Sequence, residues 1–229
     1  MRRAGGLFLL VLGSAANAGE FAAPEGCETQ FTVQLRGCVV SHHYTCTATP
    51  GDRWRAEFDE DGPFYVSRID AEAQWLEATT LRTGIATRVE LPARDAASVS
   101  RLLETGYDDY DFVEQGSDGQ GLQIVGHDRL TGEAVTIDGE PLLRTEFAYR
   151  ILSASGSELA RVEGREFVSE QHRRFFGGER VVHGQQGDQL RNSTPVEFHY
   201  PGERGFLSTT PLHDCGAMMS GLPQAGDNA

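Results

Sequence analysis

The densest positive charge in this sequence lies in one short segment, Gln171-His172-Arg173-Arg174, which leads directly into Phe175 and Phe176. Arginine clusters bind carboxylates and phosphates through charge-assisted hydrogen bonds, and exposed aromatic rings beside them would hold an apolar surface. The segment therefore offers His172, Arg173 and Arg174 as contacts for an anionic ligand head or a partner chain. The alternative is a hairpin whose two phenylalanines turn back into the core.

His42, His43 and Cys46 bring together side chains that bind copper or zinc. Neighbouring residues on a strand point to opposite faces, so His42 and His43 are poorly placed to share an ion. Cys46 is better explained as half of a disulfide. The sequence therefore favours a polar hairpin tip over a metal site here, and no metal is assigned.

Two acidic clusters, Asp59-Glu60-Asp61 and Asp108-Asp109 with Asp111, have the oxygen ligands that calcium prefers. The spacing of an EF-hand loop is missing from both. A turn explains the first cluster and a solvated acidic edge explains the second.

A hydrolase is the enzyme class that the residue types leave open. The sequence has no G-x-S-x-G motif. His127-Asp128 would point its two side chains to opposite faces of a strand, and His213-Asp214 adjoins Cys215. Neither pair forms a triad, so no catalytic residue is assigned, and a secreted hydrolase with a site built across loops remains the alternative.

All twenty basic residues are arginines, and the chain has no lysine. This composition excludes a lysine Schiff base, hence pyridoxal-phosphate chemistry, and it excludes the Walker A lysine of P-loop nucleotidases. No cofactor is therefore predicted. The formal net charge of −14 disfavours nucleic acid and anionic membrane surfaces as partners.

The first eighteen residues have the order of a secretory signal. Arg2 and Arg3 supply the positive start, residues 7–12 form a short apolar run, and Ala16-Asn17-Ala18 matches a cleavage site. The apolar run is much shorter than the ~20 residues that span a bilayer. We expect cleavage near Ala18, a periplasmic or secreted protein, and no transmembrane segment in the mature chain. A buried N-terminal helix is the alternative.

Four cysteines follow this signal, and in an oxidising compartment an even number predicts two disulfides. Four cysteines allow three pairings. A hairpin turning at Ser41-His42-His43 would place Cys38 opposite Cys46, which leaves Cys27 to join the end of the domain to its start through Cys215. This pairing is the one favoured by the sequence.

Alternation of apolar and polar residues predicts that most of the chain forms antiparallel strands with one wet face. The clearest runs are residues 31–35, 53–58, 85–91 and 143–151. Turn residues separate them, most clearly Asp138-Gly139, which is a strong hairpin signal. One short helix is expected between an Asp95 cap and Gly106, with an apolar stripe at Val99, Leu102 and Leu103.

These elements predict an all-β fold, a meander of roughly nine to eleven strands curved into a half-barrel or barrel with one short helix. The expected organisation is a signal peptide at 1–18, a flexible leader at 19–26, one domain at 27–215 and a disordered tail at 216–229. The function expected of it is non-catalytic binding of an apolar small molecule, a lipid or an envelope protein. Aromatic residues are expected to line the cradle, namely Trp54, Trp75, Phe147 and Tyr149. A purely structural or interaction module with a solid core is the other reading.

Overall fold

The computed structural model describes residues 19–185 and 187–216. The predicted signal at 1–18 and nearly all of the predicted tail lie outside these residues. Within them, one helix, α1 (Val99–Thr105), interrupts a series of strands. The strands are β1 (Cys27–Leu35), β2 (Val39–Cys46), β3 (Arg53–Asp59), β4 (Gly62–Ile69), β5 (Trp75–Thr80), β6 (Ile85–Val89), β7 (Tyr107–Gly116), β8 (Gly121–Ile137), β9 (Glu140–Ser153), β10 (Glu158–Ser169), β11 (Arg174–Phe176), β12 (Glu179–Gly184), β13 (Gly187–Asn192) and β14 (Pro195–His199).

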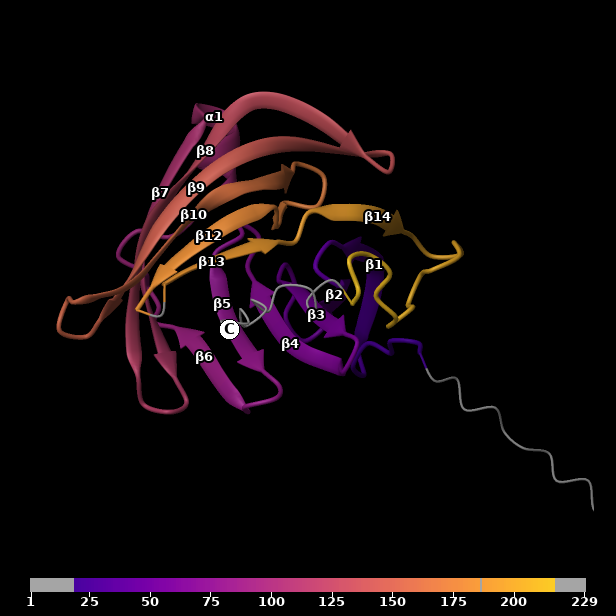
Figure 1. Ribbon diagram of the computed structural model, residues 1–229, viewed down its shortest axis with the longest axis horizontal. Helices are drawn as coiled ribbons and strands as arrows, with labels where there is room; N and C mark the ends of the chain where they lie inside the picture. The colour runs from indigo at the N-terminus through magenta and orange to yellow at the C-terminus, as the bar shows by residue number, and fades with distance from the viewer. Residues whose placement is uncertain (1–18, 186, 217–229) are drawn as a thin grey trace, which may run out of the picture.

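All strands belong to one antiparallel sheet with the order β13-β12-β10-β9-β8-β7-β6-β5-β4-β3-β2-β1-β14, and β11 pairs with β10 beside this path. The sheet curves strongly on itself but is not closed into a barrel, because β13 and β14 are its two edges (Figure 1). The predicted all-β, half-barrel-like meander is confirmed. The described residues form fourteen strands, more than the nine to eleven expected. One of them, β13, is almost entirely exposed and has no period-two apolar face by which the sequence could reveal it.

The longest hairpin joins β8 to β9 through the predicted Asp138-Gly139 turn. Both residues have positive φ, 48° and 83°, as a type I′ turn requires. Ile137 and Glu140 are direct partners across this turn. The turn thus places Glu140, the first residue of β9, at one end of the sheet.

The single helix differs from the prediction in its first residue. Ser98 caps it, because its side chain accepts a hydrogen bond from the Arg101 N–H. Asp95 lies before the helix and forms an isolated bridge with Asp111 of β7. Gly106 ends the helix in the left-handed conformation, as predicted. Among the described residues, no helix is long and apolar enough to cross a bilayer.

The expected disulfide pairing is wrong. Cys27 is bonded to Cys46, and Cys38 is bonded to Cys215. The β1–β2 hairpin turns between Leu35 and Val39, so Cys27 faces Cys46 directly in the register and Cys38 lies in the turn. Both bonds indicate an oxidising environment outside the cytoplasm.

The same hairpin places the two histidines in the middle of β2 and not at a polar tip. His42 and His43 are both buried and point to opposite faces. Phe21 from the predicted leader stacks on His42 with 4.4 Å between ring centroids. The Phe21 N–H donates to the Leu207 carbonyl, so this part of the leader is packed on the sheet.

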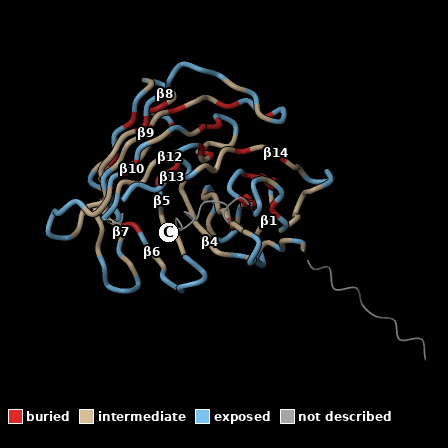
Figure 2. Tube along the Cα trace, in the orientation of Figure 1, coloured by how far each residue is buried: buried red, intermediate tan, exposed pale blue. Residues whose placement is uncertain are grey.

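Buried residues follow the middle of the strands, while the hairpin tips are exposed (Figure 2). Three apolar clusters make up the core. The first joins β1 and β14 to β10 and β11 around Phe31, Phe176 and Phe198. The second packs α1 on Val168, and the third lies around Phe112 on β7. The first cluster packs β1 and β14, at one edge of the sheet, against β10 and β11, which lie near the other edge. The candidate site lies beside this cluster.

Candidate functional site

The two predicted arginines lie where a turn of four residues leads from β10 into β11: Arg173 is the last residue of the turn, and Arg174 is the first residue of β11. Ser169 and Arg174 are partners across this turn, and Arg173 has a positive φ of 47°. Arg173 reaches the Ala71 carbonyl, Glu72 and Ser100. Arg174 points in the other direction and is only 4% exposed. Arg173 therefore pairs with an acid at the surface and Arg174 is buried, a difference that two adjacent arginines in the sequence do not reveal.

The aromatic pair after the arginines belongs to the core. Phe176 is buried in the cluster around Phe31, and Phe175 packs against the cluster around Val168. The alternative prediction, a hairpin whose two phenylalanines turn back into the core, is thus confirmed for Phe175 and Phe176. The two phenylalanines do not form an exposed patch beside the arginines.

Arg174 lines a cleft of about 390 Å³, which we call the Arg174 cleft. Its walls come from β1, β2, β3, β11 with the turn before it, and the segment after β14. The lining residues are Gln30, Phe31, His43, Tyr44, Thr45, Arg53, Gln171, His172, Arg174 and Tyr200. Positive or neutral polar groups thus line a small open cleft together with aromatic rings, and the lining contains no carboxylate among the described residues.

The guanidinium of Arg174 is buried without a counter-ion. Its one hydrogen bond is a long contact of 3.5 Å to the Trp54 carbonyl, and no carboxylate of the described residues lies within ion-pair distance. Burial lowers the pKa of Arg174 to about 9, which keeps the group protonated at neutral pH. A buried charge normally has a partner, because the loss of its hydration is costly.

Arg53 adds a second guanidinium to the cleft. It donates to the backbone carbonyls of Gly51 and Asp70, and it too has no ion-pair partner among the described side chains. Burial, and next the nearby Arg173, lower the pKa of Arg53 against the opposing effect of surrounding acids. The positive charge of the cleft is therefore larger than that of Arg174 alone.

Two histidines complete the polar wall. His43 is 3% exposed, and its Nδ1 has no hydrogen-bond partner among the described residues, whereas its Nε2 lies 3.2 Å from the Ser41 hydroxyl. The Nε2 of His172 lies 3.1 Å from the Tyr200 hydroxyl and 3.3 Å from Glu140. Burial lowers the pKa of His172 although Glu140 acts in the opposite direction.

The Tyr200 hydroxyl joins this cleft to a buried acid. It donates to Glu140 at 2.7 Å, and Glu140 also accepts from the Ser169 hydroxyl. Burial, together with the hydrogen bond to Glu140, raises the pKa of Tyr200. Tyr200 is therefore a neutral hydrogen-bond donor that fixes Glu140 and His172 in place.

Ser169, His172 and Glu140 are the residue types of a hydrolase triad, but their contacts are not those of one. The Ser169 hydroxyl is fully buried and bonds Glu140 and the backbone N–H of His172. A serine nucleophile requires a hydrogen bond to an imidazole nitrogen and access to substrate. These contacts therefore do not activate the Ser169 hydroxyl as a nucleophile.

The predicted aromatic cradle is only partly assembled. Trp75 meets Tyr149 edge-on at 5.9 Å between ring centroids, and Tyr149 stacks on Phe147 at 6.0 Å. Trp54 packs elsewhere, against Tyr44 and under the guanidinium of Arg68. The four rings therefore do not line one surface.

Acidic groups share the sheet face of Phe147 and Tyr149. Phe147 is the register partner of Asp128, and Asp128 is the partner of Asp108; direct cross-strand partners lie on the same face. Burial, and next the charge of Asp108, raise the pKa of Asp128 to about 7. Burial also raises the pKa of Glu166 on the neighbouring β10. This face is therefore not a uniformly apolar lipid cradle.

The remaining sequence candidates do not form a metal site. Burial lowers the pKa of His42 to about 3, and the two histidines of β2 face different clusters. Cys38 and Cys215 lie close to Glu60, but both sulfurs are already in a disulfide. Asp59 pairs with Arg82, and Asp108 pairs with Arg101, so each predicted acidic cluster contains an acid that is bound to an arginine.

Sequence reasoning found His172 and Arg174 but missed His43 as a cleft residue, as well as Arg53 and Tyr200. His43 and Arg53 lie on the paired strands β2 and β3, and Tyr200 follows β14, which pairs with β1 at the same edge of the sheet. The curvature of the sheet brings Arg174 and the turn before β11 against these strands. Comparison of this chain with protein-family models, curated proteins and solved structures finds no match.

Proposed function

We propose that this protein binds a small organic anion outside the cytoplasm, without catalysis. The anionic group, a carboxylate, contacts Arg174, and an apolar or aromatic body lies against Phe31, Tyr44 and Tyr200. The observation that carries the proposal is the burial of Arg174 without a counter-ion. A bidentate carboxylate would supply the missing charge and two hydrogen bonds.

The surroundings of Arg174 support a binding role. Arg53 adds charge, and His43 lines the same cleft with a buried Nδ1 that has no hydrogen-bond partner among the described residues. The cleft volume of about 390 Å³ lies at the lower end of the range for small-molecule sites. The chain as a whole is acidic and repels anions. The positively charged cleft is therefore the place on this surface that favours an anionic ligand.

The protein is proposed to reach this compartment through the signal at residues 1–18, with cleavage near Ala18 and a periplasmic or secreted location. The two disulfides support an oxidising compartment. Expression of the full gene in a Gram-negative host should yield a periplasmic protein whose mass corresponds to a chain beginning at Gly19. Full-length mass in the cytoplasmic fraction would contradict export.

Binding is tested by isothermal titration with 4-phenylbutyrate, a carboxylate on an apolar aromatic body, and with its neutral amide as the matched probe. We expect a dissociation constant below about 1 mM for the acid and at least tenfold weaker binding of the amide. Arg174→Met should weaken binding of the acid at least tenfold. Arg173→Met is the control, because Arg173 on the same turn points to Glu72.

Equal affinity for the acid and the amide would contradict the proposal. The same holds if Arg174→Met binds the acid as tightly as the unmodified protein does. If Arg173→Met weakens binding as much as Arg174→Met, the effect arises from the turn and not from the buried charge.

A further inference from the structure

The concave face of the curved sheet carries a group of aromatic rings from strands that are not neighbours. Trp75 on β5 lies edge-on to Phe112 on β7, at 5.5 Å between ring centroids, and to Tyr149 on β9, at 5.9 Å. Because β6, β7 and β8 separate β5 from β9 in the sheet order, these rings meet only on the side toward which the sheet curves (Figure 1). Trp75 is still 39% exposed, so the group is open to solvent on one side.

Two rows of cross-strand partners lie on the same face beside these rings. Tyr110, Gly126 and Tyr149 form one row. Asp128 and Phe147 are partners in the next row, two residues along the same strands and therefore on the same face. A Cβ at Gly126 would lie 2.8 Å from the Tyr110 ring and 2.4 Å from the Cβ of Tyr149, so the glycine lets both tyrosines pack closely at this point. The rows place one carboxylate directly beside several rings.

Asp128 and Tyr110 are buried on this face without polar partners. Asp128 is 6% exposed and Tyr110 is 7% exposed. Among the described residues, no group donates to the Asp128 carboxylate, and the Tyr110 hydroxyl has no hydrogen-bond partner. Burial, and next the charge of Asp128, raise the pKa of Tyr110, so the two groups lie near each other. Buried polar groups nearly always have a partner, and these two therefore mark a place that a ligand completes.

Glu166 on β10 adds a second carboxylate to the same place. It forms no hydrogen bond or ion pair with the part of the chain that the structure describes. Burial, and next the charge of Asp128, raise the pKa of Glu166, while Arg180 and Arg55 act in the opposite direction. Neither arginine lies within ion-pair distance of Glu166, and Arg55 pairs with Glu57 instead. Two neighbouring carboxylates thus remain without a bound cation.

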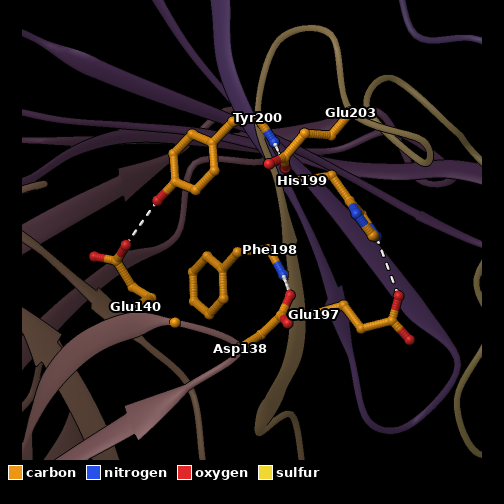
Figure 3. A pocket seen from close by; sticks show the side chains of 8 residues that line it. Asp138, Glu140, Glu197, Phe198, His199, Tyr200 and Glu203 are labelled. Carbon is orange, nitrogen blue, oxygen red and sulfur yellow. Dashed lines mark hydrogen bonds and ion pairs between the residues drawn. The ribbon is translucent and has the colours of Figure 1, made fainter.

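Acids elsewhere in the protein have donors, and this contrast singles out the concave face. In the hollow at the β8–β9 turn, the Tyr200 hydroxyl donates to Glu140 at 2.7 Å (Figure 3). Asp108, the register partner of Asp128, is bound by Arg101. Those acids need no further partner, whereas the two carboxylates of the concave face lack both a hydrogen-bond donor and a counter-ion among the described residues.

We propose that the concave face binds a small organic cation, with its ammonium group on Asp128 and Glu166 and its apolar body against the neighbouring aromatic rings. An ammonium supplies the charge and the N–H donors that both carboxylates lack, and aromatic rings attract cations. A metal ion fits less well, because the one group of potential metal ligands found close together in the described residues lies elsewhere, around the Cys38–Cys215 disulfide. This site shares no residue with the Arg174 cleft and does not depend on the function proposed for it.

Binding of a cation should displace a proton from this site. Burial, and next the charge of Asp108, raise the pKa of Asp128 to about 7, so the acid is only partly ionised at neutral pH. The cation binds the ionised form, and protons therefore compete with it. An alkylammonium keeps its own charge throughout this range. For one competing proton with a pKa of about 7, affinity should fall about tenfold from pH 8 to pH 6.

The experiment is isothermal titration with 2-phenylethylammonium, and with 2-phenylethanol as the neutral matched probe. At pH 8 we expect a dissociation constant below about 1 mM for the ammonium and at least tenfold weaker binding of the alcohol. Titrations at pH 7 in phosphate and in Tris, two buffers with different ionisation enthalpies, should reveal proton release.

Three variants locate the site. Asp128→Asn and Glu166→Gln each keep the shape and remove one charge, so each should weaken binding of the ammonium at least tenfold at pH 8. Asp109→Asn is the control, because it removes one charge from an exposed side chain that is bonded to Tyr107 on the other face. It should leave the affinity unchanged, and all three variants should bind 4-phenylbutyrate as the unmodified protein does. Urea unfolding checks that each variant is folded.

Equal binding of 2-phenylethanol would overturn the cation site, because the rings alone would then account for the affinity. An affinity that does not change between pH 6 and pH 8, or that Asp128→Asn leaves intact, would overturn it as well. If Asp109→Asn weakens binding as much as Asp128→Asn, the overall negative charge attracts the probe and the assignment to the concave face is wrong. Absence of binding up to about 10 mM of the ammonium would overturn the inference and leave the Arg174 cleft unaffected.

Discussion

Arg174→Met is expected to make the fold more stable while it removes ligand binding. The guanidinium is buried without a carboxylate partner, and its backbone contact with Trp54 is long at 3.5 Å. Methionine fills a similar space with an unbranched apolar chain and carries no charge to desolvate. A residue kept for binding rather than for stability should behave in this way.

The magnitude follows from the pKa of Arg174, which burial lowers from its ordinary value to about 9. A base with a lower pKa in the folded state opposes folding at every pH below that pKa, so at pH 7 the whole penalty applies. The difference corresponds to about 5 kcal/mol against the charged form as a ceiling. Water in the cleft reduces this penalty, and loss of the Trp54 contact costs about 1 kcal/mol. We expect a net gain of about 2 kcal/mol.

Urea unfolding at pH 7 with both disulfides intact measures this gain. In a thermal unfolding experiment, the same stabilisation of about 2 kcal/mol would raise Tm by roughly 4–8 °C for a chain of this length. Arg173→Met is the control: it loses its ion pair with the partly exposed Glu72, so we expect a loss of about 1 kcal/mol or less. If Arg174→Met is destabilised by more than this control, Arg174 holds the fold together and the reasoning is refuted.

Two further changes test the electrostatics and the covalent frame. Asp128 has a pKa raised from 3.8 to about 7, so the folded state holds its proton more tightly and stability falls as the pH rises between these values. Asp128→Asn should therefore gain up to about 4 kcal/mol at pH 8 and little at pH 4, as measured by urea unfolding; an equal effect at both pH values would contradict the assignment. Replacement of both cysteines by serine should cost about 5 kcal/mol for Cys38–Cys215 and about 3 kcal/mol for Cys27–Cys46, because they close loops with sequence separations of 177 and 19. The reverse order of urea midpoints would contradict the entropic account.

Local signals in the sequence predicted the meander well. The alternation at 143–151 and the Asp138-Gly139 turn each depend on neighbouring residues, and both elements appear as expected. The predicted disulfide pairing was wrong because the hairpin was centred on Ser41-His42-His43. The turn lies at residues 36–38, which contain Cys38. A choice between turn positions depends on the pairing of whole strands, which local residue types do not determine.

The site was predicted only in part for a related reason. The sequence grouped His172, Arg173 and Arg174 by their proximity along the chain. Arg173 ends the turn with a positive φ and Arg174 begins β11, and no residue type in the segment predicts this boundary. Arg53 and Tyr200 lie at one edge of the sheet, in the series β3-β2-β1-β14, and they share a cleft with Arg174 because the curved sheet brings β11 against this edge. Neither residue carries a local signal of this contact.

The central claim is that a ligand carboxylate completes the charge of Arg174. A crystal structure of the protein with 4-phenylbutyrate tests it most directly. The account predicts a carboxylate oxygen about 2.7–2.9 Å from the Arg174 guanidinium, with the phenyl ring between Phe31 and Tyr200. A probe bound elsewhere, or a cleft that holds the probe with its carboxylate turned away from Arg174, would contradict the account.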